Sequence, residues 1–139
     1  MPQDFLTIEA PDLALSFRAE LMADANPDVV SAVLTQLPLN SVLGHVVVSG
    51  ETIWAPTRIV HLGRNNMVPR KLGSVYLYAP GQTICMCYGR ITESANINQF
   101  AQVIDSDLPR LQALGTEVWN RSVAQPCREI VNVTIRKAA

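Results

Sequence analysis

The sequence has no apolar run approaching the ~20 residues that a membrane-spanning helix needs, and its first residues lack the basic segment and long apolar stretch of a signal peptide. The formal net charge is only −1, which gives no electrostatic reason to bind nucleic acid or an anionic membrane. There are three cysteines, and an odd number argues against the disulfide framework of a secreted protein. We therefore expect a cytoplasmic protein with reduced thiols, no nucleic-acid partner and no membrane partner.

The motifs of the common cofactor and hydrolase sites are also missing. The chain contains no P-loop, no G-x-G-x-x-G, no G-x-S-x-G and no helical pattern of metal ligands. Cys85 and Cys87 lie two residues apart in a strand-like run, so they either help to bind a soft metal or serve as small buried hydrophobic residues. Since further His and Cys residues are distant in the sequence, we expect no metal site and no cofactor.

The chain does have enough apolar residues for one core. It contains 139 residues, of which 48% are hydrophobic and 17% charged. A chain of this size and composition folds as a compact globular unit without needing disulfides or a metal. We therefore expect a single domain that covers residues 1–139.

Two strand-like runs flank Pro80-Gly81 and predict a hairpin, because Pro presets φ and Gly tolerates a positive φ in a turn. With these two residues as the loop, Leu77 is opposite Ile84, and the pairs Val75–Met86, Tyr76–Cys85, Tyr78–Thr83 and Ser74–Cys87 follow. One face is apolar and the other mixes aromatic, thiol and hydroxyl groups. Neither face resembles a charged exterior, so both sides are expected to be covered.

Other segments complete a mainly β pattern. Strands are predicted at 5–9, 13–18, 41–50, 52–54 and 128–136, while 98–104 is either a strand or the start of a helix. One helix is predicted to begin with Asn26 as N-cap and Pro27 at its first position and to end before Pro38. A second starts near Asp107, and Gly115 inside it suggests close packing against another element, because glycine there costs about 1 kcal/mol relative to alanine. Residues 57–72 are predicted to form a long loop with one short strand at 59–62. About eight strands and two helices favour a barrel packed by helices.

Five residues are candidates for a ligand site, each with a structural alternative. His45, in an apolar strand, is a general base or ligand, or a hydrogen-bonded structural histidine. Trp54 and Tyr78 have an apolar body and a polar end and line a pocket, or they are ordinary core and rim aromatics. Arg90 meets an anionic group or is solvated, and Glu51 acts as an acid or base or is an exposed carboxylate.

Several short pieces occur in an order and spacing that resembles a known family: Pro38–Ser41 with His45, Ser49–Glu51, Trp54–Pro56, Gly73, Tyr78–Gly81, Tyr88-Gly89, Asn98–Phe100, Leu111, Leu114-Gly115 and Trp119. This family consists of small bacterial and archaeal proteins of unknown function with a cyclophilin-like β-barrel. The resemblance implies a closed eight-stranded barrel with two α-helices packed on it. The chain lacks the Arg-x-x-Phe-His-type stretch and the Gly-Gly-Asp motif of the prolyl-isomerase cyclophilins, from which the family is distinct.

Barrels of this type are also similar to domains of allophanate hydrolase and 5-oxoprolinase subunits. That similarity implies a small amide or carboxylate as ligand. Our leading hypothesis places such a ligand near one end of the barrel, among the five candidate residues, with the 57–72 loop as a lid. Two alternatives stay open. One is an interaction subunit that forms a homo-oligomer, and the other is a weak peptidyl-prolyl isomerase.

Overall fold

The computed structural model describes residues 4–138. The helices are α1 (Pro27–Leu34) and α2 (Leu108–Ser122), and short 3₁₀ turns lie at Pro11–Leu13, Ala79–Gly81 and Asp105–Asp107. The strands are β1 (Phe5–Ala10), β2 (Leu15–Leu21), β3 (Leu39–His45), β4 (Gly50–Pro56), β5 (Val68–Pro69), β6 (Ser74–Tyr78), β7 (Thr83–Ile91), β8 (Asn96–Val103) and β9 (Val131–Lys137). No helix within residues 4–138 is both long and apolar enough to cross a bilayer.

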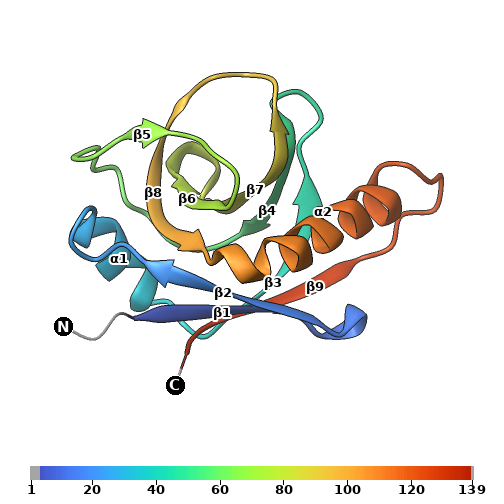
Figure 1. The fold of residues 1–139 in the computed structure, drawn as a ribbon, viewed down its shortest axis with the longest axis horizontal. Helices are drawn as coiled ribbons and strands as arrows, with labels where there is room; N and C mark the ends of the chain where they lie inside the picture. The colour runs from blue at the N-terminus through green and yellow to red at the C-terminus, as the bar shows by residue number, and fades with distance from the viewer. Residues whose placement is uncertain (1–3, 139) are drawn as a thin grey trace.

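The strands form a closed antiparallel barrel, as the sequence pattern predicts. Eight of them follow the order β2-β1-β9-β3-β4-β7-β6-β8, and β8 pairs with β2 to close the sheet. The short β5 pairs with the first two residues of β8, with Val68 opposite Ile97 and Pro69 opposite Asn96. Figure 1 shows β1, β2 and β9 as one layer and the β4, β7, β6 and β8 group curving above it.

Helix α2 packs against strands of both groups, since it contacts β2 and β3 as well as β4 and β7 (Figure 1). Its Leu111, Leu114 and Val118 are fully buried, and each such side chain stabilises the fold by about 1.5–3 kcal/mol. The apolar side of this helix therefore forms part of the main core. Asp107 precedes the helix as predicted, but its carboxylate accepts the Arg18 N–H at 2.8 Å and does not cap the helix.

Helix α1 begins at Pro27 after Asn26, as predicted. The Asn26 side chain is not a cap, however, because its amide donates to Asn98 Oδ1 and to the Gln99 carbonyl, both at 2.9 Å. A buried side chain that bonds to a neighbouring strand gives up its local capping role. Asn26 thus ties α1 to β8.

The β6–β7 hairpin has the predicted register: Val75 pairs with Met86, Tyr76 with Cys85, Leu77 with Ile84 and Tyr78 with Thr83. The turn chemistry differs from the prediction. Ala79–Gly81 forms a 3₁₀ turn, and the left-handed residue is Gln82, with φ of 51°, and not Gly81. The loop consists of the four residues 79–82 and not of two. The predicted strand pairing is preserved, and the positive φ is at Gln82, one position after Gly81.

Two predicted segments are assigned differently in the structure. The predicted strand 41–50 ends at His45, and the chain then turns through 46–49 so that β4 returns beside β3, with His45 opposite Ile53. The predicted short strand at 59–62 does not form; Ile59 is buried without strand pairing, and the short strand is β5 instead. Both differences arise because strands are defined by long-range partners that local periodicity does not specify.

Candidate functional site

His45 ends β3 on the same face as buried Leu43. Its Nδ1 lies within hydrogen-bond distance of the Val46 carbonyl oxygen, which can only accept, so Nδ1 carries the proton. Nε2 then accepts a hydrogen bond from the Tyr88 hydroxyl at 2.6 Å. Burial lowers the pKa of His45 below its usual value of 6.5, against smaller opposing effects of the Val46 carbonyl and the Glu51 charge. The imidazole is therefore neutral at pH 7.

Tyr88 of β7 is held against α2 by the absence of a side chain at Gly115. The tyrosine is only 5% exposed, and a Cβ at Gly115 would lie 2.3 Å from Tyr88 Cδ1. The close packing predicted for Gly115 is confirmed. Burial, and then the negative charge of Glu51, raises the pKa of Tyr88 to about 12, so the hydroxyl stays protonated and donates to His45.

Glu51 is positioned by an irregularity between β4 and β7. The register shifts between Gly50, which pairs with Ile91, and Thr52, which pairs with Cys87. An irregularity of this kind re-aims side chains near a sheet edge. Gly50 has a φ of 123°, and a Cβ there would lie 2.3 Å from the Arg90 carbonyl oxygen, so only glycine fits without strain.

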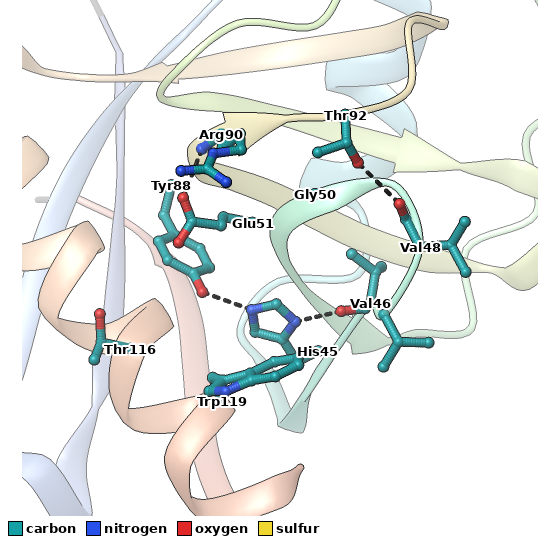
Figure 2. Close-up of a pocket in the computed structure, with 11 residues that line it drawn as sticks. His45, Val46, Val48, Gly50, Glu51, Tyr88, Arg90, Thr92, Thr116 and Trp119 are labelled. Atoms are coloured by element: carbon teal, nitrogen blue, oxygen red, sulfur yellow. Dashed lines mark hydrogen bonds between the residues drawn. The ribbon is translucent and has the colours of Figure 1, made fainter. Parts of the chain in front are cut away.

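The Glu51 carboxylate fills the space that Gly89 leaves open. A Cβ at Gly89 would lie 2.5 Å from Glu51 Oε1, and this oxygen accepts the Arg90 N–H at 2.8 Å. The carboxylate lies between the Arg90 side chain and the Tyr88 ring in Figure 2. Arg90 forms no ion pair with a carboxylate within residues 4–138. Its guanidinium is therefore free to meet an anionic group.

These side chains line a cavity of about 430 Å³. Trp119 from α2 forms one wall and meets the His45 ring edge-on, with ring centroids 4.8 Å apart. We call this the His45 cavity; its main lining residues are His45, Glu51, Tyr88, Arg90, Thr116 and Trp119 (Figure 2). One negative group, one positive group and an aromatic wall thus surround a space large enough for a small ligand.

The five candidate residues do not share one cavity. His45, Glu51 and Arg90 line the His45 cavity. Trp54 and Tyr78 line a second cavity of about 660 Å³, on the opposite face of the sheet, since Trp54 follows Ile53, which is fully buried in the main core. The loop residues Val46, Val47 and Val48 line both cavities.

Tyr88 and Trp119 line the His45 cavity, but neither was among the five candidate residues. Strand alternation already places Tyr88 on the same face of the sheet as Met86 and Ile84. Tyr76 is opposite Cys85 and therefore lies on the other face. Trp119 follows Gly115 by one helical turn, a spacing that places the two on one face of α2. Both signals were present in the sequence.

The two thiols of the hairpin have no further metal-ligating side chains grouped with them in the described part of the chain. Within residues 4–138 there is no group of three or more His, Cys, Asp or Glu side chains placed to hold an ion. Cys85 and Cys87 are buried free thiols. Burial raises the pKa of the Cys85 thiol to about 11 and also raises that of Cys87, so both stay protonated.

Comparison with known proteins identifies the fold alone. Neither a protein-family model nor a curated relative matches this sequence. Among solved structures, McbB in complex with tryptophan aligns with a TM-score of 0.84 at 22% identity, over 94% of this chain. This chain spans only 44% of the McbB chain. The hypothetical protein AF2241 from Archaeoglobus fulgidus, known from a solution structure, aligns with a TM-score of 0.66 at 19% identity over 98% of this chain and 95% of its own.

Proposed function

We propose that this chain is a single-domain barrel that binds a small carboxylate or amide in the His45 cavity. The observation that carries the proposal is the pairing of a free guanidinium, Arg90, with an oriented carboxylate, Glu51, in a cavity with an aromatic wall. Protein pockets for small polar molecules commonly combine an apolar lining with a few polar groups that fix orientation.

Each polar group has a distinct role in this proposal. Arg90 pairs with a ligand carboxylate through a charge-assisted hydrogen bond. Glu51 uses one oxygen to accept the Arg90 N–H, and its second oxygen accepts from an amide or ammonium group of the ligand. Neutral His45 and protonated Tyr88 hold one another in place, so the wall beside these two groups is already ordered before a ligand enters.

One of the solved neighbours suggests a compound of this class. McbB was solved with tryptophan, a molecule that carries both a carboxylate and an ammonium group. Tryptophan is therefore a sensible first compound to test, alongside simpler molecules that present one group at a time. The resemblance to cyclophilin-like barrels remains part of this proposal, as does the similarity of such barrels to domains of allophanate hydrolase and 5-oxoprolinase subunits, which suggested amides and carboxylates.

The test is an NMR titration of the ¹⁵N-labelled protein with L-tryptophan, acetate and acetamide. We expect cross-peak shifts around Tyr88, Arg90 and Trp119 for at least one compound. Arg90→Gln should weaken the binding of a carboxylate at least tenfold, and Glu51→Gln should weaken that of an amide or amine. Arg128→Gln, a change at an exposed position that does not line the cavity, serves as the control. Absence of localised shifts with all three compounds at millimolar concentration, or equal effects of the two arginine variants, would contradict the proposal.

The homo-oligomer alternative also has an observation in its favour. Val47 and Val48 are 72% and 76% exposed in the 46–49 loop, and adjacent exposed apolar side chains are typical of contact surfaces. Sedimentation equilibrium measures the solution mass directly, and Val47→Ser with Val48→Ser should shift an oligomer to monomer. Prolyl isomerisation remains a prediction, tested by whether micromolar protein accelerates a slow X-Pro step in a peptide.

A further inference from the structure

The second cavity, lined by Trp54 and Tyr78, is built from the mixed Tyr/Cys face of the central hairpin. Tyr76 and Cys85 are paired on this face of β6 and β7, and Ile97 of β8 packs beside them. The cavity measures about 660 Å³, which is within the range of roughly 300–1,000 Å³ typical of small-molecule pockets. Its walls are mostly apolar, and neither helix covers it.

Three aromatic side chains give this cavity a preference for flat apolar groups. Trp54, Tyr76 and Tyr78 all line it. Tyr78 is 53% exposed, so much of its ring has no protein neighbour. Aromatic rings pack favourably edge-to-face or offset-stacked against another ring, and a flat ligand would provide that contact.

Arg70 brings a positive charge into the same cavity from the 57–72 loop. A terminal nitrogen of its guanidinium donates to the Glu93 carbonyl oxygen. Its Nε–H is buried and has no hydrogen-bond partner within residues 4–138. A buried donor without an acceptor is rare in folded proteins because its desolvation is not compensated. The protein therefore satisfies the Arg70 guanidinium only in part, at the edge of an aromatic cavity.

The other polar groups around Arg70 do not neutralise it. Burial raises the pKa of Tyr76, against smaller opposing effects of a hydrogen bond from Arg70 and of the Arg70 charge, so the tyrosine hydroxyl remains neutral. The two thiols are neutral as well. Glu93 also lines the cavity, but no ion pair joins it to Arg70 in the described part of the chain. The positive charge therefore lacks a carboxylate partner.

We propose that this second cavity binds an aromatic carboxylate, with the carboxylate on the Arg70 guanidinium and the ring against Trp54 and Tyr78. The site is separate from the His45 cavity and lies across the β4–β7 pair from it. It requires neither Arg90 nor Glu51, so it stands or falls independently of the function proposed above.

The experiment compares 2-naphthoate with its neutral analogue 2-naphthamide by ¹H–¹⁵N NMR titration. We expect 2-naphthoate to shift the cross-peaks of Tyr76, Tyr78 and Ile97 and to bind at least tenfold more tightly than 2-naphthamide. Arg70→Gln should remove this tenfold preference without changing the affinity for 2-naphthamide. Arg58→Gln, an exposed arginine of the same loop, should leave both affinities unchanged.

Several results would overturn the proposal. One is equal affinity for the acid and the amide in the unmodified protein, a comparison that needs no variant to fold. Another is a set of shifts confined to Tyr88, Arg90 and Trp119, which would place the compound in the His45 cavity. A third is an Arg70→Gln protein with a dispersed native spectrum and an undiminished preference for 2-naphthoate. Arg70→Lys keeps the charge without the planar guanidinium, so an intermediate affinity is expected from it.

Discussion

Replacement of Gly115 by alanine tests the packing that holds the His45 cavity together. A Cβ at this position would lie 2.3 Å from Tyr88 Cδ1 and 2.5 Å from Cε1, whereas carbon atoms in contact are about 3.5–4.0 Å apart. The ring must therefore shift by about 1 Å in a buried environment. Overpacking of this kind costs about 1–3 kcal/mol, and the hydrogen bond between Tyr88 and His45 is worth about 0.5–1.5 kcal/mol.

Helix propensity acts in the opposite direction, because alanine is favoured over glycine by about 1 kcal/mol within a helix. The net expectation is that Gly115→Ala lowers the free energy of unfolding by roughly 1–3 kcal/mol. Urea unfolding measures this value, and an unchanged m-value would show that the native state remains compact.

A double-mutant cycle separates the steric effect from propensity. In the Tyr88→Ala background the ring is gone, so Gly115→Ala should become stabilising by about 1 kcal/mol. If Gly115→Ala stabilises the unmodified protein by that amount, the close approach of Tyr88 to α2 is wrong, and with it the account of how the cavity wall is ordered.

Three further predictions follow from the same contacts. The folded-state pKa of His45 lies below its unfolded value, so the unfolded chain binds this proton at a higher pH than the folded protein does. The free energy of unfolding, measured in urea, should therefore fall as the pH drops through about 6.5. His45→Gln should reduce this pH dependence, whereas His61→Gln should not. Gly89→Ala should displace the Glu51 carboxylate from the Arg90 N–H, which is seen as faster hydrogen exchange of that amide, and unchanged exchange would contradict it. Cys127, the exposed thiol, should react with a thiol reagent at once, whereas the two buried thiols should react only on unfolding; three fast thiols would argue against the burial described.

The parts of the fold that sequence predicts well are those set by local chemistry. The register of the β6–β7 hairpin follows from residue alternation on both sides of Pro80-Gly81, and the structure has that register. The start of α1 follows from Asn26-Pro27 in the same way. The position of β5 does not, because Val68 becomes a strand only through its pairing with Ile97, a contact that the sequence near residue 68 does not encode.

The site was harder to predict, for a related reason. His45, Glu51 and Arg90 come from β3, β4 and β7. These strands are adjacent only because of the strand order of the barrel, which the sequence does not show. The sequence does predict that Trp54 lies apart from these three residues, because Trp54 and Ile53 are adjacent in a strand and point to opposite faces of the sheet. The contact of Glu51 with the Arg90 N–H depends on the β4–β7 irregularity, which alternation alone does not reveal.

The 46–49 loop between β3 and β4 is a wall that both cavities share. Thr92 holds it to the end of β7, through its hydroxyl to the Val48 carbonyl oxygen at 2.9 Å and its N–H to the Ser49 carbonyl oxygen at 3.2 Å. The position of these residues would therefore enter the free energy of the binding proposed for each cavity. If a ligand in one cavity moves the loop and so changes the affinity of the other cavity by some factor, a ligand in the other cavity changes the affinity of the first by the same factor. If both cavities bind ligands as proposed, the three valines of this loop link the two binding equilibria across the sheet.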